Sequence, residues 1–192
     1  MPHRLKDTKI SQRAFETTLL GWTFMKNLWS PWRSKYIESF REEQIDNVCI
    51  FCDAALKDVS DPDNLLIYKN DIMLTMLNLY PYNNGHLMIV PNRHTDELTD
   101  LTVEESAEMM RQLIISKKAL MEVYQPQGFN IGANLGGASG AGIKEHLHFH
   151  IVPRWSGDTN FMPVLGEVKV ISLELKETKK NLVDVYKKIL NK

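Results

Sequence analysis

Apolar residues in the middle of this chain form short runs or alternate with polar residues, and both patterns predict β-strands. Residues 64–71 and 72–79 form two such runs, and the Asn70-Asp71 pair between them predicts a tight turn. Residues 86–91 predict a third strand, which its final proline ends. The spacing along this part of the chain therefore indicates an antiparallel sheet.

The segment 146–152, with the sequence HLHFHIV, alternates most strictly. Because successive side chains of a strand point to opposite faces, its three apolar side chains are predicted to share one face and its three histidines the other. The apolar residues are Leu147, Phe149 and Ile151, and the histidines are His146, His148 and His150. Residues 129–134 predict a further strand, joined to this segment by a glycine-rich loop at 135–142.

Two helices are predicted from apolar residues that recur at helical spacing. The first follows Thr102 and Glu105, which fit a capping box, and runs to about Tyr124. Its apolar positions are Met110, Leu113, Ile114, Leu120, Met121 and Tyr124. A final amphipathic helix is predicted from Leu175, Leu182, Val185 and Ile189, with Ser172 as its cap. The predicted class is α+β, with an antiparallel sheet, a long central helix and a C-terminal helix.

The chain has 192 residues, of which 43% are hydrophobic, and this is enough for one good core. Residues 1–24 show no clear pattern and are interpreted as an N-terminal extension of unclear role. Residues 25–192 are predicted to form a single domain that begins with an aromatic-rich strap at 28–40.

Charge and composition exclude several classes of protein. The formal net charge is -1, so neither nucleic acid nor an anionic membrane is an expected partner. No apolar run approaches the roughly 20 residues of a membrane span, and the N-terminus lacks the pattern of a secretory signal. Only two cysteines are present, which does not fit a secreted disulfide scaffold, and the expected location is the cytoplasm.

The three alternating histidines are the strongest chemical signal in the chain. A neutral imidazole is both a nucleophile and a metal ligand. At alternate positions of a strand, the Cα atom of each histidine lies about 7 Å from that of the next. They could bind a metal together, or one could attack a substrate while its neighbours orient it. A half-exposed polar strand face is the plainer interpretation.

Two further features accompany the histidines. The glycine loop could bring backbone amides close to an anion, with Asn134 and Ser139 as side-chain donors, although a surface turn would look the same. Cys49 and Cys52 could be a redox pair, half of a zinc site or two core residues. A thioredoxin-like site needs a βαβ pattern, which is absent, whereas His94 and His146 offer imidazoles that could complete a zinc site.

The His-Leu-His-Phe-His-Ile-Val segment resembles the motif of the histidine triad superfamily of nucleotide hydrolases and transferases. Residues 78–94, NLYPYNNGHLMIVPNRH, resemble a second segment of the same family, so the resemblance covers about residues 49–155. The strap LWSPWRSKYI and the tail HLHFHIVPRWSGDTNFMPV are similar to the bacterial diadenosine tetraphosphate phosphorylase (ATP adenylyltransferase) subgroup.

The resemblance implies roles for particular residues. His148 would attack the α-phosphorus of a nucleotide, and His150 and His86 would lie around the phosphates as charge stabilisers or orienters. The residues implied in substrate binding are Asn78 for the ribose, Leu79 and Phe51 for the base, and Asn134, Ser139 and Gly142 for the phosphates. Structural zinc is implied at Cys49, Cys52, His94 and His146. Core packing is an equal alternative for Leu79 and Phe51.

The implied function is a phosphorylase that cleaves dinucleoside polyphosphates, with diadenosine tetraphosphate and phosphate giving ADP and ATP. Two alternatives stay open: a hydrolase that uses water on dinucleoside polyphosphates or nucleoside phosphoramidates, and a zinc-stabilised nucleotide-binding module without turnover. A hexose-1-phosphate uridylyltransferase is disfavoured, because that branch has glutamine where His150 stands. The family also implies a homodimer with packed central helices, for which the stripe from Met109 to Met121 is suitable.

Overall fold

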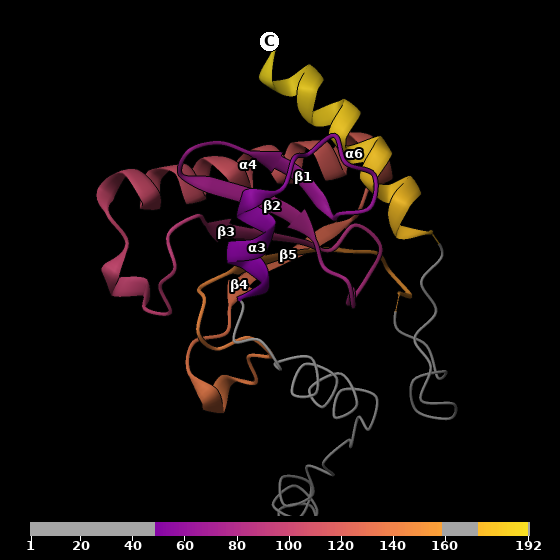
Figure 1. Ribbon diagram of the computed structural model, residues 1–192. Coiled ribbons are helices and arrows are strands. Elements are labelled where there is room, and N and C mark those ends of the chain that lie inside the picture. The colour runs from indigo at the N-terminus through magenta and orange to yellow at the C-terminus, as the bar shows by residue number, and fades with distance from the viewer. Residues whose placement is uncertain (1–48, 159–172, 192) are drawn as a thin grey trace, which may run out of the picture. The chain divides into compact units, whose positions relative to one another are not determined.

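In a computed structural model of the chain, the described residues are 49–158 and 173–191. They form a five-stranded sheet with helices on both of its faces (Figure 1). The elements are α3 (Ile50–Leu56), β1 (Leu66–Lys69), β2 (Met73–Leu77), β3 (Leu87–Pro91), the 3-10 turn η2 (Leu98–Asp100), α4 (Val103–Tyr124), β4 (Gly128–Ala133), the 3-10 turn η3 (Gly137–Ser139), β5 (Phe149–Arg154) and α6 (Leu175–Leu190). The predicted extension, the boundary at Met25 and the aromatic strap lie outside these residues.

The sheet has the strand order β1-β2-β3-β5-β4, and every neighbouring pair is antiparallel. The predicted turn between β1 and β2 is present. Asn70 Oδ1 accepts hydrogen bonds from the backbone N–H groups of Ile72 and Met73, at 2.9 and 2.7 Å, and this closes the turn. The predicted α+β class, with a long central helix and a C-terminal helix, is confirmed.

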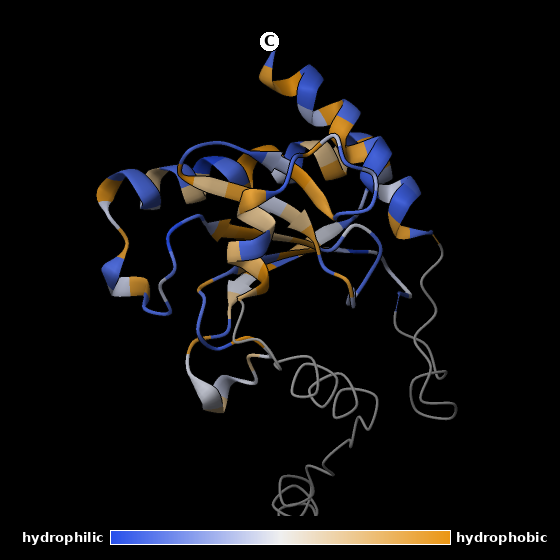
Figure 2. Cartoon of the chain, in the orientation of Figure 1, coloured by the Kyte–Doolittle hydropathy of each residue, from blue (hydrophilic) through white to orange (hydrophobic). Residues whose placement is uncertain are grey.

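Helices α4 and α6 cover one face of the sheet (Figure 1). Apolar side chains of β2, β3 and β5 pack there against Leu113 and Leu120 of α4 and Leu182 of α6. The other face of β2 and β3 packs against Phe51 of α3. All five residues of β2 and of β3 are buried, and all of them except Thr75 are apolar, so both faces of these strands are covered; Figure 2 shows them largely in orange.

Helix α4 begins and ends where the sequence predicts. Thr102 Oγ1 accepts the backbone N–H of Glu105 at 3.1 Å, and Glu105 Oε2 accepts the backbone N–H of Thr102 at 2.9 Å. The helix ends at Tyr124, where Gln125 takes the left-handed conformation. The apolar residues predicted for this helix fall into a buried set and an exposed set. Leu113 and Leu120 are buried, whereas Met110, Ile114 and Met121 are 59%, 49% and 41% exposed.

The strand that carries the histidines starts later than predicted, at Phe149 instead of His146. Strand β4 ends at Ala133, whose partner is Phe149, so earlier residues of the segment have no pairing partner on that side. The backbone N–H of Leu147 instead donates to the carbonyl of Thr95 at 2.6 Å. His146 and His148 therefore lie just before the strand, and only His150 lies in it.

The C-terminal helix α6 is amphipathic, and Figure 2 shows apolar and polar residues alternating around it. Leu182, Val185 and Tyr186 are buried against the sheet. Its N-cap is Glu174, without a side-chain cap, whereas the predicted cap, Ser172, lies outside the described residues. Among the helices of the described segments, none combines the length and the apolar character needed to cross a membrane.

Candidate active site

The imidazole of His148 is buried and held in one orientation. Its Nδ1 lies 2.8 Å from the carbonyl oxygen of His146, and because a carbonyl can only accept, the Nδ1–H donates. The ring of Phe51 packs beside it, with the centroids 5.0 Å apart. Burial lowers the pKa of His148, so the ring is neutral near pH 7. A neutral ring with its proton on Nδ1 has its lone pair on Nε2, which is therefore the nucleophilic atom.

His86 and His150 form a second hydrogen-bonded pair beside it. The backbone N–H of Tyr82 donates to His86 Nδ1 at 3.1 Å, which leaves the ring proton of a neutral His86 on Nε2. That Nε2–H lies 2.9 Å from His150 Nδ1 and donates to it. The same logic places the proton of a neutral His150 on Nε2. The rings of His148 and His150 are in edge contact, with the centroids 4.8 Å apart.

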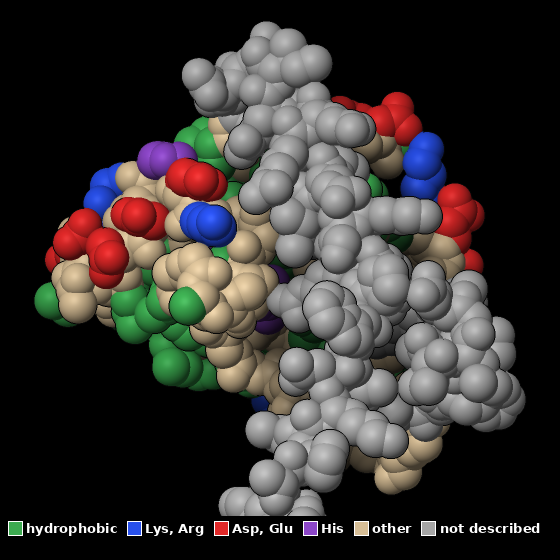
Figure 3. Space-filling model, turned by 90° about the horizontal axis from the view of Figure 1, so that it is seen from below, with side chains coloured by type: hydrophobic (Ala, Val, Ile, Leu, Met, Phe, Trp, Pro, Cys, Tyr) green, Lys and Arg blue, Asp and Glu red, His purple; other side chains and the backbone are tan. Residues whose placement is uncertain are grey.

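These three rings lie on the face of the sheet opposite α4. Met88 is paired with His150 and packs toward Phe51, whereas Phe149 and Ile151 pack toward α4. Figure 3 views this side from below, and histidine side chains, in purple, are visible among the described atoms. The arrangement places the neutral ring of His148 beside the hydrogen-bonded pair of His86 and His150 on this face of the sheet.

A second cluster joins the two cysteines to two histidines. One ligand atom from each of Cys49, Cys52, His94 and His146 lies within 4.8 Å of the others. Cys49 Sγ is 3.2 Å from His146 Nδ1, and Cys52 Sγ is 3.3 Å from His94 Nδ1. Two thiols and two imidazoles form a typical tetrahedral zinc set. The structure thus brings together all four residues that the sequence suggested as ligands.

The surroundings of this cluster suit a metal ion. His146 Nε2 donates to the carbonyl of Pro91 at 2.9 Å, which leaves Nδ1 unprotonated and directed at the cysteines. Burial raises the pKa of Cys52, and Cys49 beside it raises that pKa further. A bound cation reverses this effect, because it stabilises the thiolate. The donor set and the orientation of His146 therefore fit zinc.

The residues predicted to hold the nucleoside lie in different environments. Phe51 is fully buried against His146 and His148, whereas Leu79 is exposed after the end of β2. Asn78 is buried, and its Oδ1 accepts the backbone N–H of Tyr80 at 2.9 Å. Its side-chain amide nitrogen is the group that could meet a ribose hydroxyl.

The predicted phosphate residues lie between β4 and β5. Asn134 follows the last residue of β4 and is half-buried, as is Gly142. Ser139 is exposed, and its hydroxyl donates to the carbonyl of Gly136 at 2.7 Å. Gly136 and Gly140 have φ values of 73° and 82°, so this loop requires glycine at both positions.

Sequence reasoning missed three parts of this region. Helix α3 was not predicted, although its N-cap is Cys49 and its first turn contains Cys52. The carbonyl of Pro91 and the amide of Tyr82 were not foreseen, because a backbone group leaves no signature in its side chain. The third part is the set of hydrogen bonds around Asp158, whose residues lie in the two recognised segments but were given no role of their own.

Comparisons with known proteins agree with this geometry. A family model described as the HIT domain matches residues 60–157. The "AP-4-A phosphorylase" of Mycobacterium tuberculosis is 39% identical over 161 residues, covering 82% of this chain and 83% of that protein. The "Bis(5'-nucleosyl)-tetraphosphatase [asymmetrical]" of Schizosaccharomyces pombe is 26% identical over 63% of both chains. A solved structure, a Zn-bound histidine triad family protein from Mycobacterium smegmatis, has a TM-score of 0.58 and 27% identity, covering 74% of this chain and 96% of its own.

Proposed function

Because the chain belongs to the histidine triad (HIT) family and is an enzyme of that family, we propose that it is a phosphorylase of dinucleoside polyphosphates. The proposed substrates are diadenosine tetraphosphate and inorganic phosphate, and the products are ATP and ADP. The observation that carries the proposal is the buried, neutral His148, whose Nδ1–H is committed to the carbonyl of His146. The name of the mycobacterial relative supports the choice of substrate.

In the first proposed step, His148 Nε2 attacks the α-phosphorus of one adenosine. A nitrogen–phosphorus bond forms, and the bond to the bridging oxygen breaks, so that ATP leaves and a nucleotidyl-histidine remains. The ring gains positive charge as it is substituted, and the carbonyl of His146 at Nδ1–H stabilises this charge. His150, whose Nε2 carries a proton, donates to the phosphoryl oxygens as charge develops on them.

In the second step, an oxygen of inorganic phosphate attacks the same phosphorus. The nitrogen–phosphorus bond breaks, ADP leaves, and His148 returns to its neutral state. Covalent catalysis of this kind divides one difficult displacement into two easier ones. Asn134, Ser139 and the amide of Gly142 are proposed phosphate contacts, and Asn78 and Leu79 are proposed contacts of the nucleoside. Phe51 is proposed to support the site from beneath, since it is buried against His148.

The four-residue cluster of Cys49, Cys52, His94 and His146 is proposed to hold structural zinc. When bound, zinc would cross-link the start of α3 to His94, which follows β3, and to His146, which precedes β5. His146 contributes its ring to this cluster and its carbonyl to His148. The zinc site would therefore brace the group that orients the nucleophile. The zinc-bound mycobacterial structure supports the choice of metal.

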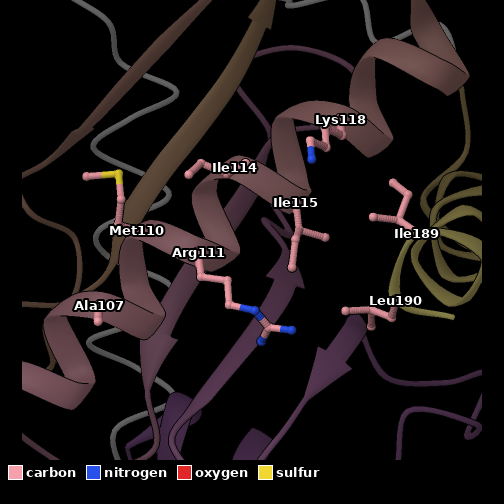
Figure 4. Close-up of a pocket in the computed structure, with 8 residues that line it drawn as sticks. All are labelled: Ala107, Met110, Arg111, Ile114, Ile115, Lys118, Ile189 and Leu190. Atoms are coloured by element: carbon pink, nitrogen blue, oxygen red, sulfur yellow. The ribbon is translucent and has the colours of Figure 1, made fainter. Parts of the chain in front are cut away.

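The exposed side of α4 is proposed to be the surface of a homodimer. A groove of about 420 Å³ runs between α4 and the end of α6, lined by Met110, Ile114 and Ile115 on one side and by Ile189 and Leu190 on the other (Figure 4). Ile131 of the edge strand β4 is also exposed. Exposed apolar side chains on a long helix and on a free sheet edge favour contact with a second copy of the chain.

The proposal is tested by incubating the purified protein with diadenosine tetraphosphate, with and without inorganic phosphate. Phosphorolysis gives ADP and ATP only when phosphate is present. Chromatography separates these nucleotides, and labelled phosphate should appear in ADP alone, since it attacks the nucleotidyl-histidine.

A hydrolase is the second candidate, favoured by the fission yeast relative that carries a tetraphosphatase name. Water would then accept the nucleotidyl group, and AMP and ATP would form regardless of phosphate. This outcome would show that the enzyme is a hydrolase and would overturn the phosphorylase proposal. Absence of turnover with both this substrate and nucleoside phosphoramidates would leave a nucleotide-binding module stabilised by zinc.

A further inference from the structure

The carboxylate of Asp158, four residues beyond β5, is almost fully buried and accepts several hydrogen bonds. Its side chain is 10% exposed. Oδ2 accepts from Asn83 Nδ2 at 2.8 Å, from Arg154 Nε at 2.6 Å and from the backbone N–H of Trp155 at 3.1 Å. Oδ1 accepts from Arg154 Nη2 at 2.9 Å. The bidentate pair with Arg154 fixes the carboxylate in one plane.

Asn83 connects this carboxylate to the loop that precedes His86. Its amide nitrogen donates both to Asp158 and to the carbonyl of Pro153, the latter at 3.1 Å. Pro153 lies on β5, the strand that carries His150. The two hydrogen bonds therefore fasten the loop at residues 81–85 to the strand that contains the third histidine of the triad.

The same loop determines the position of the proton on His86. The carbonyl of Asn83 accepts the backbone N–H of His86 at 3.2 Å, and the backbone N–H of Tyr82 donates to His86 Nδ1 at 3.1 Å. The ring of Tyr82 also packs on that of His86, with the centroids 4.7 Å apart. The tautomer of His86 thus depends on where Tyr82 lies, and Asn83 is the next residue.

We infer that Asp158 is a positioning residue for the His86–His150 pair. Through Asn83 it holds the loop where the amide of Tyr82 keeps the proton of His86 on Nε2. His86 then donates to His150 Nδ1, and His150 keeps its own proton on Nε2, the atom proposed above to donate to the phosphoryl oxygens. In the inferred role, Asp158 acts by way of Asn83 and Tyr82.

A purely structural role for Asp158 is the competing explanation, and the two differ in one observable. A stabilising ion pair affects the free energy of unfolding, but leaves the tautomer of a distant histidine unchanged. The inferred role requires the proton of His86 to redistribute between Nδ1 and Nε2 when the loop is released. This consequence can be measured without substrate, whereas its effect on the rate rests on the proposed function.

The test uses two isosteric substitutions in the full-length protein. Asp158→Asn removes the charge, and Asn83→Asp removes the amide donor and places a second carboxylate against the first. Asp63→Asn is the matched control, because it breaks an exposed ion pair with Lys176 at the start of α6. Histidine-labelled protein is examined by nitrogen-15 NMR for the tautomers, and kcat and KM are measured with diadenosine tetraphosphate.

We expect the wild type and the control to show His86 as the Nε2–H tautomer, and both test variants to show a mixture. We expect kcat to fall about 10-fold in both test variants, with KM changed less than about 2-fold, because the loss is one of alignment. An unchanged His86 tautomer in a folded Asp158→Asn or Asn83→Asp variant would overturn the inference. Absence of turnover in the wild type would contradict the proposed function, while the NMR result would still decide this one.

Discussion

At His148, burial and a single hydrogen bond control two different properties of the ring, its charge and the position of its proton. Burial lowers the pKa, so the ring stays neutral, and the carbonyl of His146 holds the one proton on Nδ1. A serine nucleophile needs a neighbouring base to remove its proton, whereas a neutral imidazole already presents a lone pair. The site therefore needs a hydrogen-bond acceptor behind the nucleophile and has no need of a base in front of it.

Replacing His148 by alanine should abolish turnover and leave nucleotide binding. The reason is that the substitution removes the attacking atom while the proposed phosphate and ribose contacts remain. We expect the rate to fall by at least about 10³-fold, with the dissociation constant of a nucleotide changed only a few-fold. Intact-protein mass spectrometry should detect a nucleotidyl adduct on the wild type and none on the variant. Retained turnover in His148→Ala would rule out the assignment of His148 as the nucleophile.

Replacing Cys49 by serine should remove zinc and lower stability. Serine is a poor ligand for zinc, and a metal bound only by the folded state contributes its binding free energy to folding. We expect elemental analysis to find one zinc per wild-type chain and none in the variant. The free energy of unfolding in urea should fall by about 2 kcal/mol or more. Wild-type protein purified without chelators but free of zinc would contradict the assignment.

The first turn of α4 shows how one element is fixed at its end. Glu105 takes part in the capping box and also accepts two hydrogen bonds from Arg93, at 2.9 and 2.8 Å. Arg93 precedes His94, so the start of this helix is tied to the residue next to a member of the four-residue cluster. The hydrogen bonds from Arg93 lower the pKa of Glu105 below its usual 4.5.

Replacing Glu105 by glutamine should reduce how much the free energy of unfolding falls as the pH is lowered. A carboxyl whose pKa is lower in the folded state stabilises the fold above the unfolded pKa, and this stabilisation is lost as the pH falls through the folded value. Urea unfolding from pH 6 down to pH 3 should therefore show a shallower loss in Glu105→Gln than in the wild type. Glu104→Gln, on the exposed side of the same turn, is the matched control. Equal slopes in all three proteins would contradict the prediction.

Elements with local signals were predictable from the sequence. The turn at Asn70 and both ends of α4 depend on residues within a few positions of one another, and the structure has them as expected. Helix α3 has no such signal, since it is seven residues long and its N-cap is a cysteine. Two of its last carbonyls are bonded by Lys69 Nζ, at 2.9 and 2.7 Å, from a different element.

The residues of the site also divide into those with a local signal in the sequence and those whose placement depends on distant parts of the fold. The alternation of the histidines placed them on one side correctly, yet their strand begins at Phe149, because pairing with β4 stops there. The four cluster residues were identified from the chemistry of thiols and imidazoles together with the resemblance to the histidine triad family. The hydrogen bonds that orient His146 and His86 come from the carbonyl of Pro91 and the amide of Tyr82, whose positions depend on the fold and not on the neighbouring sequence.

At the scale of the whole molecule, the exposed face of α4 predicts association. Ile114→Glu should convert a dimer into a monomer, because a charge in the middle of an apolar contact costs several kcal/mol. Sedimentation or light scattering measures the mass. Val103→Glu is the control, since this exposed residue lies at the start of the same helix and does not line the groove. A monomeric wild type, or a variant that stays dimeric, would contradict the proposed interface.

Removal of residues 1–24 tests the predicted extent of the domain. Residues 1–24 show no clear apolar pattern and precede the aromatic-rich strap at 28–40, so we expect the truncated protein to keep wild-type kcat and KM. The melting temperature should change by no more than a few degrees. An inactive truncation would move the boundary of the domain toward the N-terminus.

The double use of His146 has a consequence for how such a protein can change over time. Its ring belongs to the cysteine cluster, but the group that orients His148 is its main-chain carbonyl, which every amino acid carries. Selection on the proposed metal ligands and selection on the proposed nucleophile would therefore act on different atoms of one residue. A descendant could lose all four ligands together, fill the space with well-packed apolar side chains, and keep its chemistry.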